Sequence, residues 1–212
     1  MLLNDVEITR LATEQGMITP FIPELVKKNH DGVPVLSYGT SSYGYDLRSG
    51  TQFKVRKFGF HEYMMAMSSM MPALAFQYRK PIDPKCHSDD EWCSLDVNED
   101  DTGKFIILPP LTFALCNVVE YIRLPRNVTG IVTAKSTPAR NGLIIYTTVG
   151  EAGWHGIYTM EMLNSTFEPL KVYCYEGIAQ ILFECSENEP EVSYDDRSGK
   201  YQGQTGLTHG KV

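Results

Sequence analysis

From residue 104 onward the sequence is a series of short apolar runs separated by turn-forming residues. The runs recur roughly every ten residues, and several alternate apolar with polar side chains, which is typical of an all-β sandwich, barrel or jelly roll. None approaches the roughly 18–20 residues of a membrane span. We therefore expect a mainly β protein with strands in these runs: Phe105–Leu108, Thr112–Val119, Val128–Ala134, Leu143–Thr148, Ile157–Leu163, Leu170–Tyr175 and Ile178–Phe183.

The N-terminal segment predicts one short helix. Asn4 or Asp5 is a suitable N-cap, and Gly16 stands where such a helix would end. Residues 17–36 contain three prolines and are expected to be irregular. Ser37–Arg48 mixes small and aromatic residues, which fits a turn entering a strand whose backbone approaches another group closely. The apolar positions of the predicted helix are Val6, Ile8, Leu11 and Ala12.

The length of 212 residues fits a single domain that spans the whole chain. Residues 57–104 have the least regular pattern and contain a methionine cluster, so we expect a peripheral insertion there, with a partner-binding surface as the alternative. The tail, residues 193–212, is rich in Gly, Gln and Thr and too polar for a core. We expect it to form an ordered or mobile flap.

The overall charge limits the kinds of partner. A net charge of −7 argues against broad electrostatic binding to nucleic acid or to an anionic membrane, so a polyphosphate ligand needs a local basic pocket. The first residues lack the basic start and long apolar core of a signal peptide. The five cysteines show no Cys-x-x-Cys spacing. We expect a cytoplasmic protein with reduced thiols that binds neither nucleic acid nor membrane.

One carboxylate falls inside an apolar strand. Strand alternation places Glu161 on the same face as Ile157, Thr159 and Leu163. A carboxylate in such company is partly desolvated, which raises its pKa and lets it take a proton from water and pass it on. On the pattern alone, a solvent-facing glutamate beside Thr159 is the alternative.

The run Lys135–Arg140 gathers cations and hydroxyls on one short stretch of backbone. The ammonium of Lys135 and the hydroxyls of Ser136 and Thr137 can contact phosphate oxygens. Arg140 adds a fork of donors. The alternative is an ordinary polar loop between two strands, with Pro138 fixing its turn.

The segment Leu143–Leu163 is expected to form a hairpin with residues 149–154 at its tip. Gly150 and Gly153 allow backbone conformations that bulkier residues resist. Backbone N–H and C=O groups of such a hairpin can read the edge of a pyrimidine. A plain hairpin is the alternative.

The tail motif Asp196–Gly206 combines a lysine, amide side chains and glycines, which suits closure over a triphosphate. It lacks the residue order of a P-loop, and a solvated tail is the alternative. The His-x-Glu and Pro-Cys-x-x-Cys elements of zinc-dependent deaminases are missing from the sequence. A deaminase with this sequence would act without zinc, which makes a carboxylate such as Glu161 more necessary.

Together these segments resemble the dCTP deaminase family of the dUTPase-like superfamily. The matching blocks are Ser37–Arg48, Lys135–Leu163, Val172–Phe183 and Val192–Gly206. The resemblance implies a dUTPase-like distorted β-barrel or jelly-roll subunit, assembled as a homotrimer with shared active sites. It implies hydrolysis of dCTP to dUTP and ammonia, which feeds dUMP and dTTP synthesis. It also implies Mg²⁺ bound with the triphosphate, and no zinc.

The resemblance also assigns residues. Glu161 matches the catalytic glutamate, and Ser136 and Arg140 match residues that the neighbouring subunit supplies to the reacting centre. The substrate-binding matches are Lys135, Thr137, Glu151, Trp154, Tyr194, Lys200 and Gln204.

Other functions on the same scaffold stay open. A dUTP diphosphatase carries a water-activating aspartate near the position of Glu151, and a bifunctional enzyme can use Glu151 and Glu161 for different reactions. The usual glycine-rich C-terminal motif of the diphosphatases is not recognisable, which favours the deaminase. A non-catalytic nucleotide-binding protein is a further alternative. Lys135 stands where arginine is usual and Val149-Gly150 alters the hairpin, so a cytosine modified at C5 is also open as substrate.

Overall fold

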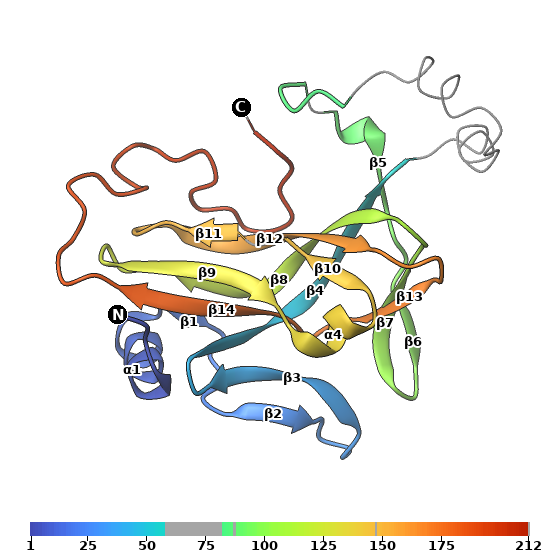
Figure 1. Ribbon diagram of the computed structural model, residues 1–212, viewed down its shortest axis with the longest axis horizontal. Helices are drawn as coiled ribbons and strands as arrows, with labels where there is room; N and C mark the ends of the chain where they lie inside the picture. The colour runs from blue at the N-terminus through green and yellow to red at the C-terminus, as the bar shows by residue number, and fades with distance from the viewer. Residues whose placement is uncertain (58–81, 87, 147, 212) are drawn as a thin grey trace.

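The computed structural model describes residues 1–57, 82–86, 88–146 and 148–211, and their fold is mainly β (Figure 1). The main sheet has eleven strands, with β10-β12-β8-β4-β14-β9-β11 as its principal order, and β13-β7-β6 form a smaller sheet. The strands are β1 (Ile18–Thr19), β2 (Leu25–Lys28), β3 (Pro34–Ser41), β4 (Gly44–Arg56), β5 (Trp92–Ser94), β6 (Asn98–Asp100), β7 (Gly103–Leu108), β8 (Phe113–Arg123), β9 (Val128–Ala134), β10 (Leu143–Ile145), β11 (Thr148–Gly150), β12 (His155–Asn164), β13 (Leu170–Tyr173) and β14 (Gly177–Cys185). The helices are α1 (Asp5–Gln15), α4 (Ser136–Arg140) and the 3₁₀ turn η1 (Asp89–Glu91).

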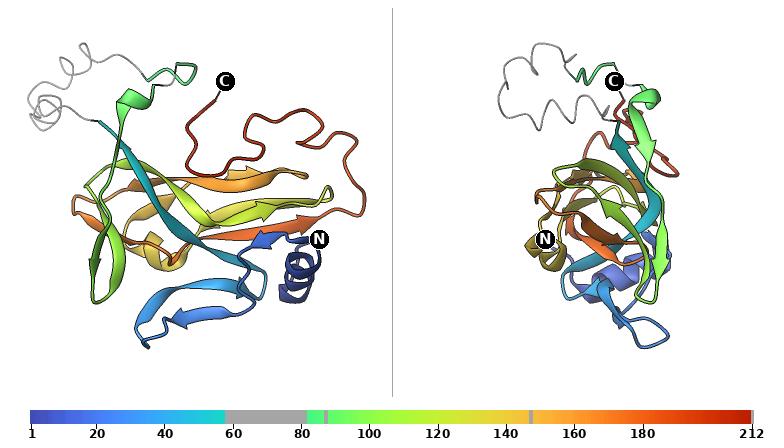
Figure 2. Two further views of the ribbon diagram at one scale, coloured as in Figure 1. Left: turned by 180° about the vertical axis from the view of Figure 1, so that it is seen from behind. Right: turned by 90° about the vertical axis from the view of Figure 1, so that its right-hand side faces the viewer.

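Strand β4 connects the two halves of the main sheet. Its first half pairs with β14, with Tyr45 opposite Ile181, and its second half pairs with β8, with Val55 opposite Ala114. The sheet curls around the core, as the two views of Figure 2 show. The mainly β prediction is confirmed. The largest fully buried side chains come from the main sheet, from β7 of the smaller sheet and from the N-terminal segment: Tyr45, Leu47, Phe53, Ile122, Met160, Met162, Phe183, Ile106, Leu108, Ile8, Met17 and Ile18.

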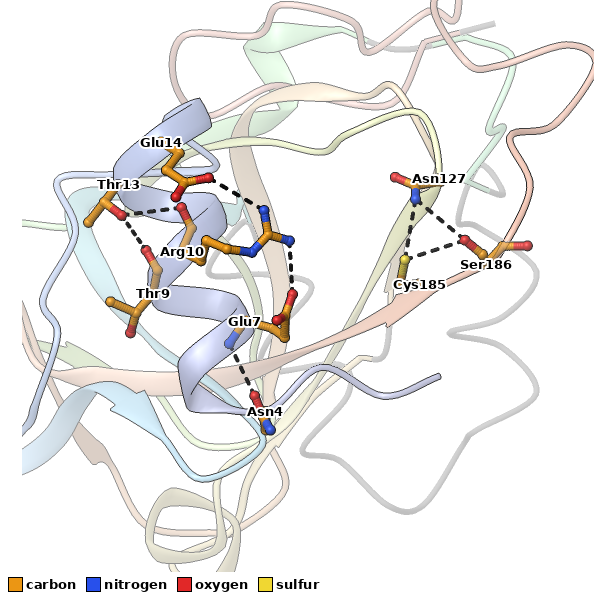
Figure 3. A network of polar contacts seen from close by, with 9 residues as sticks. All are labelled: Asn4, Glu7, Thr9, Arg10, Thr13, Glu14, Asn127, Cys185 and Ser186. Carbon is orange, nitrogen blue, oxygen red and sulfur yellow. Dashed lines mark hydrogen bonds and ion pairs between the residues drawn. The ribbon is translucent and has the colours of Figure 1, made fainter.

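Helix α1 begins and ends where its capping residues predict. The side chain of Asn4 accepts a hydrogen bond from the backbone N–H of Glu7 at 3.1 Å, and Gly16 ends the helix with φ of 65°. On the exposed face the guanidinium of Arg10 bridges the carboxylates of Glu7 and Glu14 (Figure 3). The predicted helix is confirmed, and its buried residues are Ile8, Leu11 and Ala12.

The prediction that residues 17–36 are irregular is wrong in part. The short strand β1 pairs with β8, and β2 pairs with β3. The prolines do not prevent these strands because Pro20 follows β1 and Pro34 is the first residue of β3, a position that a strand tolerates. The close approach predicted for Ser37–Arg48 is confirmed at Gly39, where φ is 101° and a Cβ atom would lie 2.1 Å from the carbonyl oxygen of Glu24.

The predicted hairpin Leu143–Leu163 is right at its base and wrong at its tip. β10 pairs with β12, with Ile145 opposite Met162. β11 instead leaves the hairpin and pairs with β9, with Val149 opposite Ile131. The run predicted as one strand over Leu143–Thr148 is therefore split between two partners. Glycine at position 150 permits the pairing of β11 with β9, because the Tyr158 hydroxyl fills the space that a Cβ atom would need.

Part of residues 57–104 lies outside the described residues, including the methionine cluster. In the described part, β5 pairs with β4 and β6 pairs with β7. That the segment is a peripheral insertion stays a prediction. None of the helices in the described ranges combines the length and the apolar character needed to cross a membrane.

Candidate active site

A pocket of about 620 Å³ lies where the C-terminal tail passes over β12. This volume is within the range of roughly 300–1,000 Å³ that is usual for small-molecule sites. The pocket brings together many of the residues that the sequence assigned to catalysis and substrate binding. These are Glu151, Trp154, Glu161, Tyr194, Lys200 and Gln204.

Glu161 is placed in the pocket by the alternation of β12. Tyr158, Met160 and Met162 point into the core, while the opposite face, which carries Glu161, is half-buried. Desolvation raises the pKa of the Glu161 carboxyl above its ordinary value of 4.5. Its Oε2 atom is buried and finds no hydrogen-bond partner among the described residues. The prediction that Glu161 is a desolvated carboxylate is confirmed, and the alternative of a solvent-facing glutamate is wrong.

Three more buried polar atoms line the same pocket without a partner in the described part of the chain. They are Thr148 Oγ1, the Tyr158 hydroxyl and Gln204 Oε1. Buried polar atoms in folded proteins are nearly always paired with protein or water. Because their residues line the pocket together with Glu161, these atoms mark a place that receives a polar ligand or ordered water.

The tail is ordered against β12. The Gln204 carbonyl accepts from the Ile157 N–H at 2.9 Å, and Trp154 Nε1 donates to the carbonyl of Tyr201 at 3.0 Å. Figure 1 shows the tail running along β11 and β12, on the opposite side of the sheet from α1. The tail therefore forms one wall of the pocket.

Charged groups stand at the rim. The carboxylate of Glu151 forms an ion pair with Arg197 of the tail. The exposed ammonium of Lys200 donates to the carbonyl of Lys211 at 2.7 Å, and the Tyr194 hydroxyl accepts from the N–H of Tyr201 at 3.0 Å. The rim thus carries both signs of charge, with one ion pair joining Glu151 to the tail and the Lys200 contact lying within the tail.

The run Lys135–Arg140 lies elsewhere. Residues 136–140 form the short helix α4 rather than a loop, with Pro138 buried and Ser136, Thr137 and Arg140 exposed. Ser136 and Thr137 line a second hollow that shares no lining residue with the Glu161 pocket. Within the described part of one chain, the predicted catalytic residues therefore fall into two separate groups.

Asp46 is a residue of this second hollow that the sequence argument missed. Its carboxylate forms an ion pair with Lys135 and accepts from Gln180 Nε2 at 3.1 Å. Lys135 Nζ also donates to Ser37 Oγ at 3.1 Å. The sequence signalled the segment Ser37–Arg48, but it gave no sign that this aspartate would meet a lysine so distant along the chain. The ammonium predicted to bind phosphate is therefore already engaged, and its phosphate role stays a prediction.

The described residues contain no cluster of three or more His, Cys, Asp or Glu side chains arranged to hold a metal ion.

This chain resembles known proteins over most of its length. A family model described as dCTP deaminase-like matches residues 2–186. A dCTP deaminase of Laribacter hongkongensis is 43% identical over 205 residues, which cover 97% of this chain and 96% of the relative. A dCTP deaminase of Herpetosiphon aurantiacus is 44% identical over 201 residues, with 95% and 94% covered.

The crystal structure of 2′-deoxycytidine 5′-triphosphate deaminase from Agrobacterium tumefaciens has a similar fold. The TM-score is 0.53 at 15% sequence identity. The matched region covers 87% of this chain and 48% of the Agrobacterium chain. The similarity shows that this chain and that deaminase share a fold. With the family match over nearly the whole sequence and relatives above 40% identity, this chain belongs to the dCTP deaminase-like family.

Proposed function

We propose that this chain is a dCTP deaminase, a cytoplasmic enzyme that hydrolyses dCTP to dUTP and ammonia and so feeds dUMP and dTTP synthesis. The observation that carries the proposal is the buried, unpaired carboxylate oxygen of Glu161 in a pocket of nucleotide size. The names of the relatives support the choice of substrate. The absence of zinc-deaminase elements from the sequence supports a reaction without zinc.

Glu161 acts as the proton shuttle. Its carboxylate takes a proton from a water molecule, and the hydroxide adds to C4 of cytosine to form a tetrahedral intermediate. Glu161 then delivers that proton to N3. It takes the second proton from the C4 hydroxyl as the C4 carbonyl forms and delivers it to the amino group, which leaves as ammonia. The raised pKa of Glu161 suits both steps, because a general base and acid works best near the operating pH.

A second subunit completes the site. Ser136 and Arg140 are exposed in one chain and stand apart from Glu161. In a homotrimer, α4 of one subunit meets the Glu161 pocket of the next. Arg140 then keeps Glu161 ionised at the start of the cycle and stabilises charge that develops on the base. Ser136 positions the attacking water.

The triphosphate is held at the rim of the pocket. Lys200, Gln204 and Tyr194 come from the tail, and Thr137 comes from the neighbouring α4. Mg²⁺ enters as part of the substrate, because a small hard cation binds phosphate oxygens and water more readily than a dedicated protein cage. Glu151 and Trp154 line the same pocket and stay assigned to the substrate.

The test is product analysis after incubation of the purified protein with dCTP and Mg²⁺. Wild type is expected to form dUTP and ammonia, and Glu161→Gln is expected to form both at least about a hundredfold more slowly. Glu168→Gln is the matched control, because Glu168 is exposed and outside the pocket. Formation of dUMP and diphosphate would instead point to the bifunctional alternative and to Glu151. If wild type leaves dCTP unchanged, the proposal is wrong for this substrate, and a C5-substituted dCTP becomes the next to assay.

A further inference from the structure

Strands β12, β8, β4 and β5 present one continuous face outside the core. Glu161 lies opposite Leu115 of β8, and Leu115 lies opposite Lys54 of β4. On the far side of β4, Arg56 lies opposite Trp92 of β5. Directly opposed residues project to the same side of a sheet. An outward-facing row therefore leads from Glu161 across the sheet to β5.

The C-terminal tail crosses this face. Beyond Gln204, the N–H of Leu207 donates to Gln52 Oε1 on β4 at 3.0 Å, and the N–H of Thr208 donates to Thr159 Oγ1 on β12 at 2.9 Å. Figure 1 shows the C-terminal tail beside β12. The tail thus spans the sheet from the Glu161 strand toward β5.

His209 ends the crossing with a cluster of side-chain contacts. Its ring lies 4.9 Å from the ring of Trp92, which is only 8% exposed. Its Nε2 atom is 3.0 Å from the ammonium of Lys54 on β4 and 3.4 Å from a carboxylate oxygen of Asp89 on η1. The His209 side chain is 10% exposed, so this one side chain of a polar tail is buried against β4, β5 and η1.

We propose that His209 is a positioning residue for the reaction at Glu161, docking the end of the tail on Trp92 and Lys54 and so fixing one wall of the nucleotide pocket. This inference rests on the proposed function. Thr208, His209 and Trp92 line the same pocket as Glu161, Lys200 and Gln204. A tail released from Trp92 opens that wall and loosens the groups assigned to the triphosphate. His209 does not touch the reacting atoms, so its loss weakens substrate binding more than it slows chemistry.

Three variants test the docking without nucleotide. His209→Ala removes the ring and its polar contacts, and His209→Phe keeps a ring for Trp92. His30→Ala is the matched control, because His30 is exposed and far along the chain from the tail. Trypsin cleavage after Lys200 is followed by mass spectrometry. We expect trypsin to cleave His209→Ala about tenfold faster than wild type, because the lost aromatic contact and its hydrogen bonds contribute about that factor to docking. His209→Phe is expected to recover part of the protection.

The same variants are then assayed with dCTP and Mg²⁺. For His209→Ala we expect KM to rise by about tenfold while kcat stays within about twofold of wild type. Cleavage of His209→Ala at the rate of His30→Ala would overturn the docking. Faster cleavage with an unchanged KM, or a loss confined to kcat, would overturn the positioning role. If wild type converts no dCTP, the proposed function fails, and the cleavage rates alone then decide the docking.

Discussion

The carboxylate of Asp46 on β4 and the ammonium of Lys135, the residue before α4, form an ion pair whose side chains are 6% and 12% exposed. Gln180 of β14 and Ser37 of β3 complete the network through hydrogen bonds to Asp46 and Lys135. Since Ser136 follows Lys135 directly, this network fixes where the exposed face of α4 begins.

Asp46→Asn is expected to lower the free energy of unfolding by about 3 kcal/mol, because it leaves the Lys135 ammonium buried without its counter-charge. Urea unfolding at fixed protein concentration measures the change. Asp31→Asn is the control, since Asp31 is exposed in the loop before β3. Equal stability of the two variants would mean that the ion pair does not hold α4 in place.

Gly150→Ala is expected to destabilise the protein by about 1–3 kcal/mol through overpacking. A Cβ atom at this position would lie 1.8 Å from the Tyr158 hydroxyl and 2.9 Å from Leu124 Cδ1. In a Tyr158→Phe background the loss is expected to be smaller, because the first clash is removed. Tyr158→Phe alone should lose no stability, since its hydroxyl has no partner within the described ranges.

Thermal or urea unfolding of the four chains in this cycle gives the coupling between positions 150 and 158. Gly210→Ala is the control, because nothing lies within 4 Å of a Cβ atom built there. An identical loss for Gly150→Ala in both backgrounds would show that the Tyr158 hydroxyl does not occupy this space.

Glu161→Gln is expected to be more stable than wild type at neutral pH, and the advantage should vanish in acid. Desolvation raises the folded-state pKa of Glu161 above 4.5, so in the window between the two pKa values the folded state holds a proton that the unfolded state has released. The stabilising effect of that proton is complete below the unfolded pKa and is lost as pH rises through the folded pKa. Urea unfolding of both proteins at about pH 4 and about pH 8 measures it. The same stability difference at both pH values would contradict the desolvation of this carboxylate.

Subunit mixing tests the proposed homotrimer with shared active sites. Glu161→Gln and Arg140→Ala are each expected to be inactive alone, because every site lacks one of the two residues. After subunit exchange at equal amounts, about a quarter of the sites combine an intact Glu161 with an intact Arg140 from the neighbour, so activity should return to that level. Mixing each variant with itself is the control. No recovery despite demonstrated exchange would place both residues within one subunit's site.

The features that local sequence predicted are those fixed by neighbouring residues. Helix α1 follows from Asn4 and Gly16, which satisfy its end groups, and β12 follows from strict alternation, which sets the face that carries Glu161. These depend on contacts within a few positions along the chain.

The features that sequence could not predict depend on distant partners. β11 pairs with β9 because Gly150 and Gly130 leave room for the Tyr158 hydroxyl, and alternation does not reveal which strand will be the neighbour. The pairing of Asp46 with Lys135 and the docking of His209 on Trp92 likewise join segments far apart in the sequence. The tail composition predicted polarity, but not the face it would cover.

We propose that Glu161 transfers the protons in deamination of dCTP. The most direct measurement is the rate of dUTP formation by Glu161→Gln at saturating dCTP, with the affinity for dCTP determined by calorimetry on the same sample. We predict that kcat falls by about 10²- to 10⁴-fold, the usual contribution of a general acid–base, while the dissociation constant stays within a few-fold of wild type. A Glu161→Gln protein that forms dUTP at the wild-type rate would contradict the claim.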